Sequence, residues 1–475
     1  MVVTTAYCFN DKLFFYYPIS LLLIFISNFI NFSGALYLKT FELSLITNIL
    51  RMPLSTITNL FIFNIIIIIS HYFYRNIKLM NDLNGKFRQL ILKFDLDKVH
   101  DLNFLYILSI IAVLVKLLTY DLSTSINMQS FSTGPGLLQD FLNGFKFLFY
   151  LPISILFYQI SNNLNNKKFY IFFIVYIITI FFISLSINNR SVFFDAILLI
   201  FIIFFLNFLF SEKKNTNNSS FGIIIIFFIT FQLINFLENF SRNYALERNL
   251  YFERSPIENF YSFFKNQFNE DNTQIYDDII KQRETFFSEQ FYKKSIFNRI
   301  NILIINDNLM FSKSQLSSRE IKQIQNLQMN QIISVIPQPI INIFTNNFNK
   351  TDYTQLTVSS YIYGLVDFMY GNKSIGSVLM TLFIIFDKYL YLVLLFLFIP
   401  FFAFFDSFYN KDKRIFSPYI LMFFYTTSFG LLNILSTTDF SNIITLTLRA
   451  IPQTMLYIII INFFYKNIFK KKNLK

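Results

Sequence analysis

The sequence contains no tryptophan and only one cysteine, Cys8. A single cysteine excludes an intrachain disulfide and any zinc site built from several thiolates. Glycine is also scarce, with ten residues in a chain of 475, and none of them belongs to a G-x-x-x-x-G-K-[ST] motif that would hold nucleotide phosphates. The sequence therefore gives no indication of disulfide chemistry or of ATP use.

Charged residues are also scarce. They make up 14% of the chain, whereas hydrophobic residues make up 54%. Several apolar runs approach or exceed the roughly 18 residues that a membrane-spanning helix needs. The sequence thus predicts an all-α polytopic membrane protein. We interpret the 67 phenylalanines as codon bias of an AT-rich genome, and so as lipid-facing or core filler. The first apolar run is too long for a signal-peptide core and lacks a small-residue cleavage site, so we expect it to be the first span.

Ten transmembrane helices fit the pattern of apolar runs. We expect them near residues 13–36, 57–74, 103–120, 139–160, 169–187, 191–210, 221–238, 375–405, 415–435 and 443–465. The eighth is long for one crossing, because about 31 residues rising about 1.5 Å each exceed a hydrocarbon core of about 30 Å. Asp387 and Lys388 interrupt it, so it is either a tilted helix or a broken helix with a re-entrant first half.

Lys and Arg concentrate in alternate connections between these spans. Basic clusters lie within 75–100, 167–168, 211–220 and 409–414 and in the C-terminal tail, whereas 121–136 has no Lys or Arg. The positive-inside rule then places both termini in the cytoplasm, with Lys39 and Arg51 as exceptions in the first outer loop. The net charge of +12 is explained by this bias rather than by nucleic-acid binding.

The polar segment 239–374 is expected to be one large extracytoplasmic loop carrying short helices. The predicted organisation is therefore 1–238 with seven transmembrane helices, 239–374 as the loop, and 375–475 with three transmembrane helices and a basic cytoplasmic tail.

Charges near the membrane gather on the predicted outer side. They are Lys116, Asp140, Lys146, Arg190, Asp195, Glu238, Asp439 and Arg449. Snorkelling to the interface is one explanation for such charges, and a wet charged chamber open to the outer face is the other. Lys146 and Arg449 lie about two turns deep, which favours the chamber for these two. Asp195 is expected to orient a neighbouring cation, either Lys146 or Arg449.

Arginines cluster directly after the seventh span. Arg242, Arg248 and Arg254 stand there, and Arg283, Arg299 and Arg319 follow further along the loop. Arginine grips phosphate oxygens with a planar fork, so this cluster suits a lipid-linked diphosphate. The alternative is a solvated loop in which Glu247, Glu253 and Glu258 balance the arginines.

Histidine is absent from the predicted outer side, because the only two, His71 and His100, fall at cytoplasmic ends of spans. A general base there must be a carboxylate, with Glu238, Glu247, Glu253, Asp307 and Asp367 as candidates. A D-x-D pattern in residues 94–98 has the spacing of some metal-binding glycosyltransferases, but it lies in a predicted cytoplasmic loop and is common by chance. We expect no metal site.

Four stretches resemble the O-antigen and exopolysaccharide repeat-unit polymerases, which have about ten to fourteen spans and one large periplasmic loop. They are "NNRSVFFDAILL" with Arg190, "ENFSRNY" with Arg242, "FNRINILI" with Arg299 followed by "SVIPQPIINIF", and "SSYIYGLVDFMYGNKSIGSVLM". Gln338 stands where the family usually has a basic residue. The motif resemblance covers roughly 180–390, and the remainder of the chain is similar only in its expected topology.

The resemblance implies a metal-independent glycosyltransferase of the bacterial inner membrane, without a cofactor. Its substrates would be undecaprenyl-diphosphate-linked oligosaccharides, and its further partners membrane lipid, a chain-length regulator and a flippase. The resemblance points to Arg190, Arg242 and Arg299 as substrate-binding residues, and the charge pattern adds Arg248, Arg449 and Lys146. The candidate catalytic carboxylates are Glu238, Glu247 and Asp367.

Three other functions stay open at this point. A lipid-linked oligosaccharide flippase or another transporter would also need a charged cavity, although the chain shows no internal repeat. An O-antigen ligase is a second alternative, which usually employs a loop histidine that this chain lacks. A membrane scaffold is the third, and it would leave the outer charges unexplained.

Overall fold

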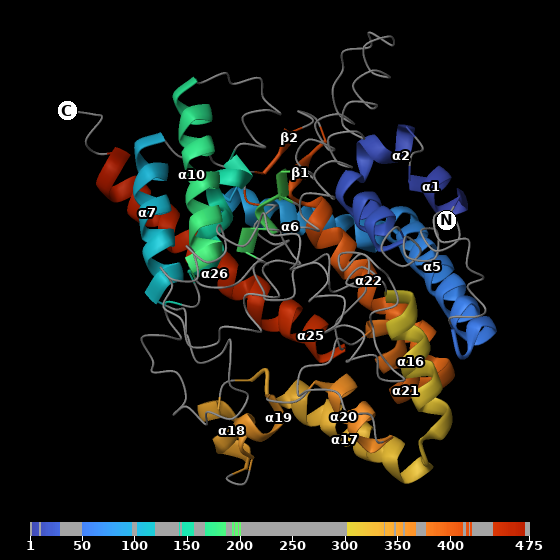
Figure 1. Ribbon diagram of the computed structural model, residues 1–475. Coiled ribbons are helices and arrows are strands. Elements are labelled where there is room, and N and C mark those ends of the chain that lie inside the picture. The colour runs from blue at the N-terminus through green and yellow to red at the C-terminus, as the bar shows by residue number, and fades with distance from the viewer. Residues whose placement is uncertain are drawn as a thin grey trace, which may run out of the picture. The chain divides into compact units, whose positions relative to one another are not determined.

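The computed structural model describes the chain in segments. These are residues 2–8, 11–28, 50–96, 102–118, 142, 145–155, 167–186, 192–193, 195–197, 199–200, 302–336, 338–345, 348–354, 357–366, 377–411, 415–417, 419 and 440–470. The described residues are mostly helical, and the one sheet among them is a two-stranded antiparallel hairpin (Figure 1).

Two described helices are long and apolar enough to cross a membrane, Pro53–Asn76 and Ile443–Asn467. They coincide with the second and tenth expected spans. Shorter apolar helices, Pro18–Asn28, Asn103–Leu118, Tyr170–Ser184 and Leu390–Asp406, fall within four further expected spans. Expected span 221–238 lies outside the described residues, and so does 415–435 except for 415–417 and Tyr419, so the full count of ten stays a prediction.

The chain packs into two compact units. Unit 1 comprises Met1–His100 and Ile300–Lys475, and unit 2 comprises Asp101–Arg299. Unit 1 thus combines the first expected spans with the second half of the large polar segment and everything after it.

The centre of unit 1 is a pair of parallel helices, α5 (Pro53–Asn76) and α22 (Leu390–Asp406). At one end the Tyr391 hydroxyl donates to the Asn59 side-chain oxygen at 3.0 Å. Further along, the rings of Phe63 and Phe398 meet edge to face with centroids 6.2 Å apart. Helix α22 is almost entirely apolar and α5 largely so, and the face that each turns to the other is buried, which removes that surface from water or lipid.

One end of this pair, here called the α6 end, carries the basic helix α6 (Lys78–Lys93) and the hairpin of β1 (Tyr409–Asn410) and β2 (Ile415–Phe416). The Asn84 side chain donates to the Ala403 carbonyl at 2.9 Å, and Arg88 donates to the Ser407 carbonyl at 3.3 Å. Helix α1 (Val2–Cys8) also belongs to this end, because Tyr7 hydrogen-bonds His71. Helix α2 (Asp11–Tyr16) leads into Tyr17, whose ring meets that of His71 edge to face.

The opposite end, here called the α16 end, is formed by helices from the large polar segment and by α21 (Figure 1). They are α16 (Ile302–Gln315), α17 (Ser318–Ile333), α18 (Gln338–Phe344), α19 (Lys350–Thr354), α20 (Val358–Leu365) and α21 (Val378–Phe386). The expected short helices are therefore present. Helix α17 begins with a capping box in which the side chains and backbones of Ser317 and Glu320 bond reciprocally.

The eighth expected span is broken rather than tilted as one rod. Helix α21 ends at Phe386, the single 3-10 turn η3 (Asp387–Tyr389) follows, and α22 begins at Leu390. Asp387 takes φ 48° and ψ −120°, a conformation that non-glycine residues rarely adopt and that no helix can continue through.

The last described segment is one continuous helix with two widened turns. It runs through α25 (Phe440–Thr445), the π-helical turn η4 (Leu446–Ala450), α26 (Ile451–Phe464) and the π-helical turn η5 (Tyr465–Lys470). Pro452 lacks an N–H group and its ring crowds the carbonyl one turn earlier, so the wider turn before it relieves that clash.

Unit 2 is described through α7 (Leu102–Leu118), the 3-10 helix η2 (Lys146–Tyr150), α10 (Lys167–Ser186) and short pieces between 192 and 200. The buried Tyr176 of α10 donates its hydroxyl to the Phe149 carbonyl at 2.7 Å, which ties α10 to η2. Tyr106 of α7 meets Phe172 of α10 edge to face, with ring centroids 4.4 Å apart.

Candidate functional site

Most of the residues predicted to form the site lie outside the described residues. They are Arg190, Arg242, Arg248, Arg299, Glu238, Glu247 and Asp367, together with Asp140, Glu253 and Asp439. Their roles stay predictions. Lys146 begins η2, a position that is described for its backbone only.

Arg449 is exposed on the π-helical turn η4, three residues before Pro452. Single π-helical turns within α-helices are frequent at functional sites, because the extra residue per turn redirects the side chains it carries. Pro452 was the sequence signal that could have located this turn.

Unit 2 holds a charged cluster around Asp195, five residues after the predicted site residue Arg190 in the sequence. The Asp195 carboxyl group interacts electrostatically with Lys116 and is hydrogen-bonded to the Tyr150 side chain. The Tyr150 hydroxyl also donates to the Val192 carbonyl at 3.3 Å, and the Lys116 ammonium lies 5.7 Å from the centre of the Phe149 ring. The sequence suggested Lys146 or Arg449 as the cation near Asp195. Among the described side chains of unit 2, Lys116 has that place.

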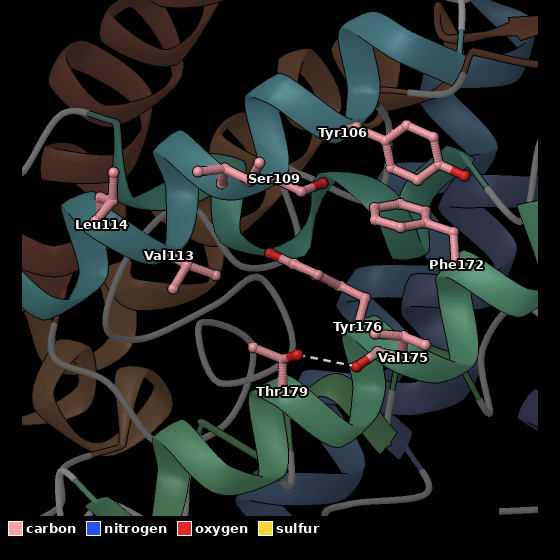
Figure 2. Close-up of a pocket in the computed structure, with 9 residues that line it drawn as sticks. Tyr106, Ser109, Val113, Leu114, Phe172, Val175, Tyr176 and Thr179 are labelled. Atoms are coloured by element: carbon pink, nitrogen blue, oxygen red, sulfur yellow. Dashed lines mark hydrogen bonds between the residues drawn. The ribbon is translucent and has the colours of Figure 1, made fainter.

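An apolar groove runs between α7 and α10 beside this cluster (Figure 2). Its volume is about 430 Å³, and it is lined by Tyr106, Ser109, Ile110, Val113, Leu114, Phe172, Val175, Tyr176 and Thr179. Figure 2 shows the two helices closest at Tyr106 and Phe172 and further apart toward Leu114 and Thr179. The groove is thus closed at one end by an aromatic pair and open at the other.

A second polar cluster is buried at the α6 end of unit 1. The Asp406 carboxylate accepts from the backbone N–H groups of Ile19 and Ser20, at 3.2 and 3.0 Å, and from the Ser20 hydroxyl at 2.7 Å. Because these N–H groups open the helix Pro18–Asn28, Asp406 caps that helix and meets the positive end of its dipole.

The same serine links Asp406 to His71. Ser20 Oγ lies 3.0 Å from His71 Nε2, and the Tyr7 hydroxyl lies 2.8 Å from His71 Nδ1. A neutral His71 protonated at Nε2 satisfies every partner: Tyr7 donates to His71, His71 to Ser20, and Ser20 to Asp406. This order differs from a catalytic triad, because Ser20 gives its proton to the carboxylate and not to the imidazole.

Asp307, one of the carboxylates considered as a base, has a similar capping position at the α16 end. It accepts from the backbone N–H groups of Arg51 and Met52, at 2.6 and 3.0 Å, and from the Thr56 hydroxyl at 2.9 Å. Helix α5 has no side-chain cap of its own, so Asp307 supplies the acceptor at its positive end. With both oxygens engaged in this way, Asp307 is a structural cap and not a free base.

Lys313 and Gln325 donate hydrogen bonds to the last carbonyl groups of α21. Lys313 Nζ lies 2.7 Å from the Asp387 carboxylate and donates to the Phe383 carbonyl at 3.1 Å, and Gln325 donates to the Ile385 carbonyl at 2.8 Å. The last carbonyls of a helix have no partner within it, so these side chains satisfy the break from two neighbouring helices.

Gln338 stands where the resembling family usually has a basic residue. Its amide donates to Asn342 Oδ1 at 2.7 Å and to the Phe348 carbonyl at 2.6 Å, and its oxygen accepts from the Lys350 N–H at 3.2 Å. These bonds hold the turn after α18, which leaves Gln338 a structural role.

Two amides at the α16 end have no hydrogen-bond partner among the described residues. Both Asn306, on α16, and Gln328, on α17, are buried to within 2% of their accessible surface. Buried polar groups are nearly always paired, so these two mark a polar interior within the helices of the large segment.

No described group of three or more His, Cys, Asp and Glu side chains could hold a metal ion. Of the D-x-D pattern, Asp97 lies outside the described residues, and the Asp95 carboxylate pairs with Lys466. Asn462 donates to the Phe94 and Asp95 carbonyls as well, which anchors α26 on the end of α6. Comparison with known proteins finds no matching family, no matching curated protein and no matching solved structure.

Proposed function

We propose that the chain is a multi-pass protein of the bacterial cytoplasmic membrane that polymerises undecaprenyl-diphosphate-linked oligosaccharide repeat units on the outer side. The observation that carries this proposal is the two-ended build of unit 1. Basic α6 contacts one end of the α5–α22 pair through Asn84, and helix α16 contacts the other through Asp307. Under the positive-inside rule the α6 end faces the cytoplasm, and the helices of segment 239–374 are then outside.

The reaction proposed is glycosyl transfer from a growing chain to a single lipid-linked repeat unit. The acceptor hydroxyl oxygen bonds to the anomeric carbon of the donor, the bond from that carbon to the diphosphate breaks, and undecaprenyl diphosphate leaves. The hydroxyl proton passes to a carboxylate, for which Glu238, Glu247 and Asp367 are the candidates.

Arginines are proposed to stabilise the charge that develops in this step. Negative charge develops on the leaving diphosphate, and preorganised cations stabilise it. Arg190, Arg242, Arg248 and Arg299 are the proposed donors, with Lys146 and Arg449 as further cations. The Lys116–Asp195–Tyr150 cluster supports this assignment, because it places a charged, hydrogen-bonded group five residues along the chain from Arg190.

The test is reconstitution of the purified protein with lipid-diphosphate repeat units. We expect a ladder of lipid-linked glycans that lengthens one repeat at a time on electrophoresis. Movement of the lipid across the membrane without any new glycosidic bond would exclude the polymerase.

A lipid-linked oligosaccharide flippase is the second candidate, and one observation favours it. Hydrogen-bonded chains of ionisable groups inside membrane proteins often serve as proton relays, and the chain Tyr7–His71–Ser20–Asp406 has that form. A proton-coupled flippase would require a pH gradient for lipid movement and would lose that movement in Asp406→Asn. Polymerisation in detergent, where no gradient exists, separates the two candidates.

A further inference from the structure

The groove between α7 and α10 offers hydrocarbon contact and almost no hydrogen bonding. The Ser109 hydroxyl donates to the Leu105 carbonyl at 2.8 Å, Thr179 to the Val175 carbonyl at 2.9 Å, and Tyr176 to the Phe149 carbonyl at 2.7 Å. Sugars and peptide backbones need hydrogen-bond partners when they are buried. Three of the four hydroxyls that line the groove are thus engaged, the fourth being that of Tyr106 at its closed end, so the groove suits a hydrocarbon chain.

Its shape argues against another helix as the occupant. Helices that pack closely inside membranes use small residues at the contact. Here only Ser109 and Thr179 of the lining residues are small. The rest are Ile110, Val113, Leu114, Val175 and three aromatic residues, with Tyr106 and Phe172 closing one end. A flexible chain with methyl branches can fill the spaces between such large side chains. A helix would be held away from the groove by these side chains and would leave the spaces unfilled.

A cation stands at the open end. Lys116 is seven residues after Ser109 and three after Val113, so it continues the stripe of α7 that lines the groove. From Tyr106 to Lys116 the helix rises about 15 Å, which is half of a hydrocarbon core of about 30 Å. The groove thus has the depth of one leaflet, with Lys116 and the Asp195–Tyr150 pair at the level of a lipid head group.

We propose that this groove binds the head-proximal part of a polyprenyl chain, with the phosphate of that lipid near Lys116. The single furrow between two helices admits one branched chain, in contrast to the two straight chains of a phospholipid. This inference rests on the proposed function for the identity of the lipid. It adds the place where the lipid is held, in unit 2.

The test uses a polyprenyl monophosphate with a diazirine near its third isoprene unit, bound to the full-length protein in phospholipid nanodiscs. After illumination, peptide mass spectrometry locates the label. We expect it on α7 around Val113 and on α10 around Val175, removed by unlabelled polyprenyl monophosphate but not by added phosphatidylglycerol. Label spread evenly over the exposed faces of both helices, or removed equally by phosphatidylglycerol, would mean ordinary annular lipid and would overturn the proposal.

Two tryptophan variants give a matched pair. Val113→Trp fills the groove, while Ile111→Trp places the same side chain on an exposed face of α7 that does not line it. Because the chain has no tryptophan of its own, the fluorescence of each variant reports whether it is folded. We expect Val113→Trp to reduce specific labelling by about tenfold, equivalent to about 1.4 kcal/mol, and Ile111→Trp to leave it unchanged. Equal labelling of the two variants, both folded, would overturn the proposal that the lipid binds in this groove.

Lys116 is tested by comparing polyprenyl monophosphate with uncharged polyprenol as competitors. Lys116→Gln should remove the preference for the phosphate, and Lys116→Arg should retain it. An unchanged preference in Lys116→Gln would contradict the head-group assignment. Failure of the groove and failure of the enzyme remain distinguishable. A glycan ladder without localised label refutes the groove alone, and localised label without a ladder refutes the polymerase alone.

Discussion

The hydroxyl of Thr56 donates a hydrogen bond of 2.9 Å to the carboxylate of Asp307, across 251 positions of the chain. The same carboxylate accepts from two backbone N–H groups ahead of α5. The large polar segment is therefore joined to a membrane-length helix by a charge placed at the positive end of that helix. This contact joins the part of the segment from Ile300 onward to unit 1.

Replacing Asp307 should destabilise unit 1. Asp307→Ala removes the cap of α5 and leaves buried donors without an acceptor, so we expect a loss of about 1–2 kcal/mol in the free energy of unfolding. Denaturant unfolding in detergent, followed by circular dichroism, measures it. Asp352→Ala is the matched control, because Asp352 is exposed and accepts only from Asn349. Equal stability of the two variants would contradict the capping role.

Asp406 should be more sensitive, because it is wholly buried and receives several donors. Asp406→Ala should cost about 3 kcal/mol or more, since Ser20 and the start of the helix Pro18–Asn28 lose their acceptor. Asp406→Asn keeps one acceptor oxygen and should lie between wild type and alanine. The exposed Asp82→Ala on α6 serves as the control in the same unfolding experiment. A different order of stabilities would contradict the role of Asp406 as the acceptor at the end of this hydrogen-bonded chain.

Glu320 gives the structure a local pH dependence. Hydrogen bonds from the side chain and backbone of Ser317 lower the pKa of the Glu320 carboxyl. The folded-state pKa is below the unfolded value of about 4.3, so the stabilisation is present above that value and is lost as pH falls through the folded-state pKa. Hydrogen-exchange protection at the start of α17, corrected for intrinsic rates, should therefore fall in acid.

Glu320→Gln provides the control for this effect. Glutamine can also form the capping box but does not titrate, so protection in this variant should not change with pH. Glu320→Ala should lack the protection at every pH. A pH-dependent loss of the same size in Glu320→Gln would assign the effect to another group.

Cys8 should react slowly with alkylating reagents. Burial raises the pKa of the Cys8 thiol to about 12, so little of the reactive thiolate exists near neutral pH. The double variant Cys8→Ser/Ala6→Cys moves the thiol to an exposed position of the same helix and should react much faster. Mass spectrometry after timed maleimide treatment compares the two. Similar rates would show that α1 does not shield Cys8.

Arg190 should be needed for polymer formation. Arg190→Ala removes a proposed diphosphate contact, and losing one preorganised donor to developing charge costs about 10²–10³ in rate in well-studied enzymes. The glycan ladder should disappear while membrane insertion and the unfolding profile stay the same. Lys322→Ala, on the exposed face of α17, removes a cation that belongs to no predicted site and should retain the ladder.

Sequence patterns predicted the long apolar helices, because hydropathy is a local signal. They also located the interruption at Asp387, but left a tilted and a broken helix as alternatives that only the structure separates. They also predicted short helices in the large polar segment. They did not predict Asp406 or Ser20 as partners, since a cap that comes from a distant helix leaves no mark in local spacing. The same holds for Gln338, whose three hydrogen bonds close a turn. Asp307 was singled out for its charge, and only its contacts distinguish a cap from a base. Arg190 and the loop arginines remain predictions.

The break at Asp387 divides the stretch 378–406 into two helices with different axes of support, because the Asp387 backbone leaves the helical conformation between α21 and α22. A rotation or an axial shift of α21, caused by its neighbours at the α16 end, would then be taken up at Asp387. It would not be transmitted along α22. The α6 end, with its buried Asp406, would then stay still while the opposite end adjusts to a bulky substrate.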